Sequence, residues 1–154
     1  MKIIKSAIWS RIKKATSIYK VQTTVAVAGF GYYGVNLLRL KDGDILIVDL
    51  STANIQSGLI DLDYLIRLAT KGVKVFSTNN LTMGYFIGDQ VAFVGPRIVQ
   101  RSFLGNSDWM KNQDHLIEFT VPKEVQEIRE FVNNLNIEYL DTEALRRLKR
   151  EYQL

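Results

Sequence analysis

A glycine-rich segment is the first candidate for chemistry. Gly29, Gly31 and Gly34 form the pattern G-x-G-x-x-G directly after a β-branched apolar run, and Asp49 stands twenty positions beyond Gly29. In dinucleotide-binding units such glycines let the backbone approach a pyrophosphate, and an acidic residue at this separation binds the ribose. The helix expected next, about 35–40, is short, and a helical segment precedes the strand. The pattern therefore indicates either a dinucleotide site or a plain glycine-rich turn.

Other reactive side chains are few. The chain has no cysteine and a single histidine, His115. This composition excludes disulfides, thiol nucleophiles, thiolate zinc sites and multi-histidine metal sites within one chain. Asp61 and Asp63 lie on an expected helix and would point their carboxylates apart. We therefore expect no metal and no cofactor, and His115 stays a weak candidate for catalysis.

The segment 81–98, LTMGYFIGDQVAFVGPRI, reads as two short strands joined by a Gly-Asp-Gln turn. It resembles the signature region of the phospholipase D superfamily, H-x-K-x4-D-x6-G-S-x-N. The strand–helix–strand run before it and the segment KNQDHLI at 111–117 after it extend the resemblance over roughly residues 5–135. With one copy of the motif, the chain is similar to the small endonucleases of that superfamily, which work as homodimers.

The departures from this motif bear on the reaction. Thr82 stands where the family has its nucleophilic histidine, Gly84 stands where it has lysine, and Asp89 matches the aspartate. The serine and asparagine have no counterpart in register. Without an imidazole to attack phosphorus and a cation to hold phosphate, the resemblance implies the fold but argues against the reaction. The sequence predicts a pseudoenzyme.

The positive charge is concentrated at one end of the chain. The net charge is +4, and residues 1–20 hold six Lys or Arg and no acidic residue. Such a basic end favours an anionic partner, either nucleic acid or a membrane surface that Trp9 would enter, or else it is a solvated helix face. Arg97 and Arg101 follow the hairpin, where the family binds phosphate. The candidate phosphate and nucleic-acid contacts are Lys13, Lys14, Arg97 and Arg101.

Length and hydrophobic periodicity predict one α/β domain over residues 1–154, with a mixed, mostly parallel sheet flanked by helices. Strands are expected at 21–28, 45–50, 73–76, 83–87, 91–94 and 116–119. Helices are expected at 1–20, 35–40, 59–69, 122–135 and 141–152, the first basic and the last capped by Asp141.

Together these patterns predict a catalytically degenerate phospholipase D-like protein that acts as a cytoplasmic homodimer. We expect it to bind nucleic acid, or to serve as an interaction protein built on the same dimer. Three alternatives stay open: an active phosphodiesterase that uses His115 in an atypical site, a dinucleotide-binding regulatory domain, and a membrane-surface protein.

Overall fold

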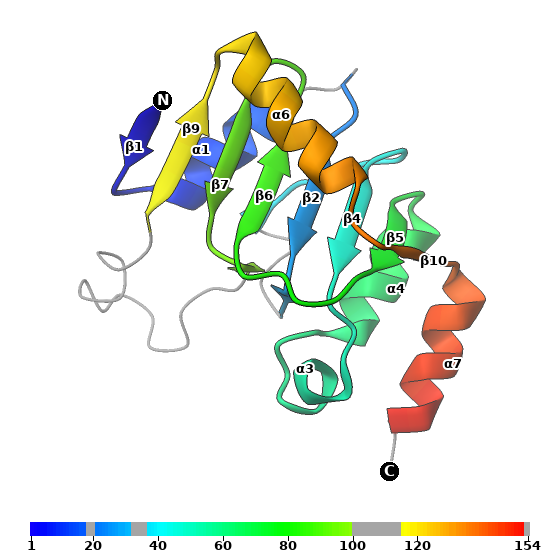
Figure 1. The fold of residues 1–154 in the computed structure, drawn as a ribbon. Coiled ribbons are helices and arrows are strands. Elements are labelled where there is room, and N and C mark those ends of the chain that lie inside the picture. The colour runs from blue at the N-terminus through cyan, green and yellow to red at the C-terminus, as the bar shows by residue number, and fades with distance from the viewer. Residues whose placement is uncertain (18–20, 32–36, 100–114, 153–154) are drawn as a thin grey trace.

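A mixed sheet of eight strands forms the centre of the protein (Figure 1). The structure is a computed structural model, and it describes residues 1–17, 21–31, 37–99 and 115–152. Across the sheet the strands lie in the order β1, β9, β7, β6, β2, β4, β5, β10. Their bounds are β1 Lys2–Ile4, β9 Leu116–Phe119, β7 Ala92–Gly95, β6 Gly84–Ile87, β2 Thr24–Val27, β4 Ile45–Val48, β5 Lys74–Ser77 and β10 Glu138–Leu140.

The α/β class and the mixed sheet are confirmed, but the expectation of a mostly parallel sheet is wrong. Within the eight-stranded sheet, β2 pairs with β4 and β4 with β5 in parallel, whereas the other pairs of neighbouring strands run antiparallel. Parallel neighbouring strands need a long crossover connection, whereas antiparallel neighbours can be joined by a short hairpin. We call the end of the sheet at which β2, β4 and β5 finish the carboxyl end, and the other the amino end.

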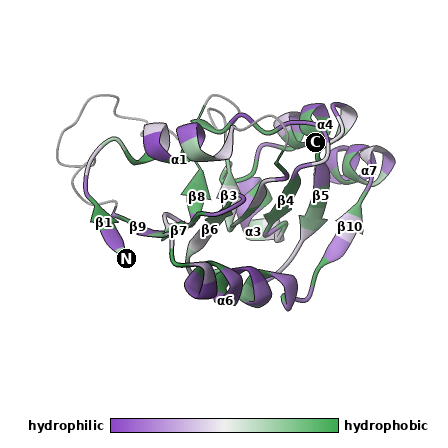
Figure 2. Ribbon diagram, turned by 90° about the horizontal axis from the view of Figure 1, so that it is seen from above, coloured by the Kyte–Doolittle hydropathy of each residue, from purple (hydrophilic) through white to green (hydrophobic). Residues whose placement is uncertain are grey.

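Helices cover both faces of this sheet unequally (Figure 2). On one face, here called the α1 face, lie α1 (Ile8–Thr16), α4 (Leu62–Thr70) and α7 (Thr142–Tyr152). The opposite, α6 face carries α6 (Pro122–Asn133), the one described helix on that side. The short α3 (Thr52–Gln56) follows β4 at the carboxyl end.

Two hydrophobic clusters match this arrangement. The larger cluster fills the α1 face and includes Ile12, Leu65, Phe86 and Leu145. The smaller one lies under α6 around Val125 and Val132.

One apolar row on the α6 face crosses all eight strands, because residues paired in register point to the same side. It consists of Ile3, Ile117, Val94, Tyr85, Ala26, Ile47, Phe76 and Tyr139. Since α6 covers only the middle of this row, Ile3 and Tyr139 at its ends stay 56% and 57% exposed.

The N-terminal segment is not one continuous helix over 1–20. Residues 2–4 pair with β9 as strand β1, so Ile3 and Ile4 obey a strand period rather than a helical one. Ala7 then takes a left-handed conformation with φ 51°, and α1 begins at Ile8. A sheet edge competes with the helix here and wins because it buries Ile4 against Leu116.

A small parallel pair, β3 (Gly29–Phe30) with β8 (Ile98–Val99), folds over the α1 face of the large sheet (Figure 2). The sequence did not predict β3, β8, β10 or α3. Of the expected helix 35–40, residues 37–40 are described, and only Leu37 is helical there.

The C-terminal helix was predicted correctly, and Asp141 caps it by accepting a hydrogen bond of 2.8 Å from the Ala144 backbone N–H. Just after α4, Gly72 adopts φ 105°, a left-handed conformation that favours glycine at the end of a helix.

Candidate nucleic-acid interface

Helix α1 presents its basic residues outward because of its helical spacing. Ile8, Ile12 and Thr16 recur every four residues and are buried against the α1 face. Turning that stripe inward places Arg11 and Lys14 on the exposed side. Helix α1 contains no acidic side chain, so the cations on its exposed side meet no opposite charge from the helix itself.

Arg11 is held in place by a carboxylate from the sheet. Its Nε and Nη2 both donate to Oε1 of Glu118, at 2.9 and 2.6 Å. Glu118 lies on β9 on the α1 face, and its side chain is only 7% exposed while that of Arg11 is 44% exposed. A carboxylate buried this deeply requires a cationic partner. The pair therefore holds the guanidinium in place while nearly half of the Arg11 side chain stays open to solvent.

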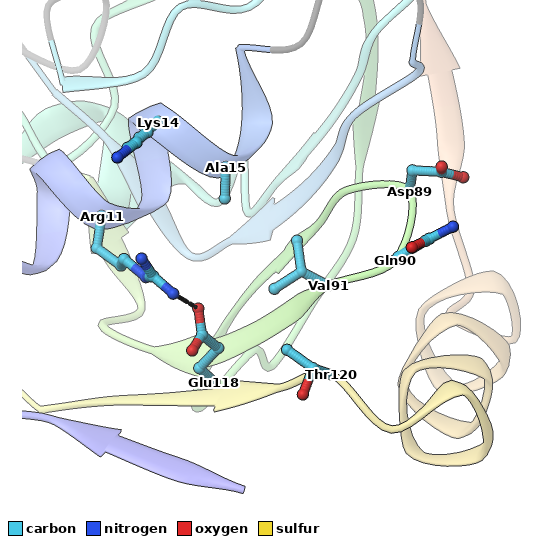
Figure 3. Close-up of a pocket in the computed structure, with 8 residues that line it drawn as sticks. All are labelled: Arg11, Lys14, Ala15, Asp89, Gln90, Val91, Glu118 and Thr120. Atoms are coloured by element: carbon cyan, nitrogen blue, oxygen red, sulfur yellow. Dashed lines mark hydrogen bonds and ion pairs between the residues drawn. The ribbon is translucent and has the colours of Figure 1, made fainter.

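A hollow of about 380 Å³ opens beside this pair, between α1, β7 and β9 (Figure 3). Ala15 and Val91 give it apolar walls, and Thr120 lines it just past the end of β9, with its methyl group toward Val91. Asp89 and Gln90 stand at its rim on the β6–β7 turn. Cations next to an apolar pocket suit a ligand that is anionic at one end and apolar at the other.

A second hollow lies on the other side of the same turn. It is about 500 Å³ in volume and is lined by Val21, Gln22, Gly88, Asp89 and Arg129. Arg129 of α6 donates from Nη2 to the carbonyl oxygen of Gly88 at 2.8 Å, so it anchors the turn between the two hollows.

The catalytic positions of the resembling motif are split between the two ends of the sheet. Thr82 and Gly84 lie at the carboxyl end, where β6 begins, together with exposed His115 at the start of β9. Asp89 lies past the far end of β6, beside the first hollow. The structure therefore does not bring Asp89 to the other two.

Gly84 has a structural reason to be glycine. A β-carbon built on it would lie 1.8 Å from the carbonyl oxygen of Pro96, and one built on its partner Gly95 would lie 2.8 Å from Cδ1 of Leu116. Real β-carbons do not approach other atoms so closely. The chain that turns from β7 into β8 thus occupies the space that a lysine side chain at position 84 would need.

The glycines of the dinucleotide alternative are engaged by protein. The backbone N–H groups of Ala28 and Gly29 donate to the carbonyl oxygen of Arg97 at 2.6 and 3.1 Å, and that of Gly31 donates to Val99 at 3.1 Å. Gly29 and Phe30 form strand β3 instead of a turn that opens a helix. Amides used in this way cannot cradle a pyrophosphate, which disfavours this alternative. Gly34 lies outside the described residues.

Asp49, the acidic partner in that alternative, accepts a hydrogen bond of 3.0 Å from the backbone N–H of Ser51 and helps shape the start of α3. Trp9, on which membrane insertion depends, is half-buried with its ring edge-on to Phe86 at 5.9 Å. It is therefore packed partly into the protein, which disfavours its insertion into a lipid surface.

The predicted nucleic-acid contacts that the structure describes do not form one patch. Lys14 lies toward the amino end on α1, whereas Arg97 is exposed at the carboxyl end beside Gly29. Lys13 shares α1 with Lys14, and Arg101 lies outside the described residues.

Sequence reasoning missed Glu118 and Arg129. Glu118 carried a usable signal, because it is an acidic residue inside the apolar strand LIEF. Arg129 carried none, since it lies among the many charged residues of α6.

Within the described residues there is no group of three or more acidic or histidine side chains that could hold a metal ion. Nor does any described helix combine the length and apolarity needed to cross a membrane.

Comparisons with known proteins add little. No protein-family model matches the chain, and no curated protein matches it. Among solved structures, it is similar to TrmBL2, an archaeal chromatin protein described as showing a novel mode of DNA binding. The TM-score is 0.43 at 12% identity, over 88% of this chain and 53% of that one. The chain thus spans about half the length of that neighbour, and a likeness at this level decides neither family nor function.

Proposed function

We propose that this protein binds nucleic acid through the phosphate backbone, using the exposed basic side of α1. The observation that carries the proposal is that residues 1–20 contain six cations and no acid, and that burial of the apolar stripe of α1 turns Arg11 and Lys14 outward. Lysine and arginine contacts to phosphate supply affinity without reading sequence. Binding is therefore expected to be independent of sequence and sensitive to salt.

The double substitution Lys13→Ala and Lys14→Ala tests the proposal. A control of equal charge exists on α7, where Arg146 and Arg147 are also adjacent and cationic; both are exposed, whereas Lys13 is partly buried. In Figure 2 α7 lies at the opposite end of the α1 face from α1. Both double variants change the net charge equally, so they separate a local contact from a general charge effect.

The measurement is fluorescence anisotropy with labelled duplex and single strands at several salt concentrations. For a dimer that neutralises several phosphates, we expect a slope of log affinity against log salt of about −4 to −5 on duplex DNA. Loss of Lys13 and Lys14 should weaken binding for all sequences and flatten the slope, while the α7 control should change little. Absence of binding at low salt, or equal losses in both variants, would refute the proposal.

The second part of the proposal is that the protein does not hydrolyse phosphodiesters. It is supported by Thr82 in place of an imidazole and by Gly84, whose surroundings leave no room for a lysine. The test is incubation with DNA, RNA and bis-(p-nitrophenyl) phosphate. Cleavage without metal that disappears in His115→Ala would reverse this part and make His115 a nucleophile.

The third part concerns assembly. The single copy of a motif whose working site is built from two copies supports a two-fold dimer with Thr82 near the axis. Thr82 and Met83 are exposed, as this arrangement requires. Light scattering at micromolar concentration gives the mass directly, and a clean monomer would end this part without affecting the α1 interface.

A further inference from the structure

The hollow beside Arg11 has features that phosphate binding alone does not use. Phosphates need cations at the surface, and Lys14 supplies one there. The hollow adds a recess of about 380 Å³ with Ala15 and Val91 facing its interior. Small-molecule sites begin at about 300 Å³ and combine apolar walls with a few polar groups. The recess is therefore large enough for a small flat group.

Arg11 is prepared to take part in this recess. Its Nε and Nη2 both donate to one carboxylate oxygen of Glu118, whose side chain is only 7% exposed, and this pairing restrains the guanidinium plane. Arginine planes stack on nucleobases, and such stacking tolerates any base because every base has a π-face. Preorganisation by Glu118 lowers the entropy lost when a ring settles on that plane.

We propose that this hollow accepts one unstacked nucleobase of a single strand, lying against Arg11 and between Ala15 and Val91, with the adjoining phosphate at Lys14. Thr120 lines the hollow, and rotation about its χ1 would bring its hydroxyl to the edge of the base. Glu118 is a positioning residue that acts through Arg11. This inference rests on the proposed function and deepens it, since it names the form of nucleic acid that is preferred. A duplex keeps its bases stacked and paired, so it reaches the cations but not the hollow.

The first experiment compares a poly-dT single strand with a duplex of equal length. Base–arginine contacts lead us to expect the wild type to bind the single strand about tenfold more tightly. Ala15→Phe fills the hollow and should lower single-strand affinity to the duplex value while leaving duplex affinity unchanged. The control is Gln126→Phe, which adds the same ring at an exposed position of α6 and should change neither affinity.

A second variant tests the same site in case Ala15→Phe does not fold. Thr120→Val keeps the volume of the side chain but removes the hydroxyl, and it should reduce the preference for the single strand two- to threefold. The fluorescence of 2-aminopurine placed in the strand reports stacking directly, and we expect it to change on binding to wild type but not to Ala15→Phe.

Glu118→Gln separates positioning from a merely structural role. Because it removes a negative charge next to the cations, duplex affinity should rise. Because it loosens Arg11, single-strand preference and the 2-aminopurine response should fall. A residue that only supports the fold would move both affinities in the same direction.

The outcomes distinguish this inference from the function beneath it. If neither the single strand nor the duplex binds, the proposed function is refuted. If both bind equally and Ala15→Phe changes nothing, the phosphate interface stands and the base site is refuted. Tight binding of free adenosine monophosphate without preference for a strand would also refute it, and would assign the hollow to a free nucleotide.

Discussion

The two faces of the sheet are built differently. On the α1 face, three described helices and the β3–β8 pair cover the strands so closely that backbone meets backbone at Gly84. On the α6 face, a single described helix covers the middle of an apolar row and leaves its ends exposed. The charges differ as well, since α1 is basic and the exposed side of α6 carries Glu127 and Glu130. The α1 face therefore holds most of the packing that defines the fold, and the candidate interface lies on the exposed side of its helix α1.

The largest effect should come from placing a lysine at position 84, on the α1 face. Gly84→Lys requires the Pro96 carbonyl to move by more than an ångström, so we expect a loss of more than about 4 kcal/mol in the free energy of unfolding. Urea denaturation followed by circular dichroism measures it. Thr82→His, at an exposed position two residues away, should stay within about 0.5 kcal/mol. Equal tolerance of both would contradict the packing described at Gly84.

Truncating one apolar residue on each face compares the two cores. Leu65 on α4 is fully buried, and Leu65→Ala should cost about 3 kcal/mol through the cavity that it leaves. Phe131 on α6 is 51% exposed although it stacks on Tyr85 at 5.1 Å, and Phe131→Ala should cost less than about 1 kcal/mol. Thermal unfolding of both variants checks the order, and a reversed order would mean that a partner covers the α6 face in solution.

The Arg11–Glu118 pair should respond asymmetrically to truncation. Arg11→Ala leaves a buried carboxylate without its partner, and we expect a cost of about 2 kcal/mol. Glu118→Ala leaves a cation that is already 44% exposed and can be hydrated, so about 1 kcal/mol is expected. Chemical denaturation of the two single variants and the double variant gives the coupling between them. Equal costs would mean that Lys2, opposite Glu118 on β1, compensates for the lost arginine.

The smallest expected effect concerns the α6 face at high pH. Burial raises the pKa of Tyr85 above its ordinary value of 10.0, because the phenolate loses hydration there. The unfolded chain therefore ionises first, so this contribution is constant below pH 10 and stability falls as the pH rises above it. Tyr85→Phe should flatten that alkaline loss in urea titrations between pH 9 and 11. An unchanged alkaline slope would show that Tyr85 is solvated.

The sequence predicted what hydrophobic periodicity controls. The strand 116–119 and the helix that Asp141 caps were predicted correctly, because their local patterns agree with their tertiary surroundings. It failed where tertiary pairing overrides local pattern. Ile4 satisfies a helical spacing, yet it belongs to β1 because β9 offers an open edge.

The candidate interface was predictable only in part. The charge of α1 could be read from residues 1–20, but the hollow depends on Glu118 and Val91, which are far from α1 in sequence and meet it only in the fold. From the resemblance to a catalytic motif, Gly84 was interpreted as the loss of a lysine. The reason for the glycine lies in Pro96, and only the register of β6 with β7 brings the two together.

The contact between Gly84 and Pro96 also limits how this protein can change over generations. A lysine at position 84 clashes unless the chain from β7 to β8 is first rerouted, and a rerouted chain around glycine leaves an unfilled cavity. Each change alone is expected to destabilise the protein. A phosphodiesterase site with a lysine at position 84 would therefore need at least two changes together. Substitutions at the exposed rim of α1 meet no such barrier, which makes that rim the part of the molecule where new binding preferences can accumulate one residue at a time.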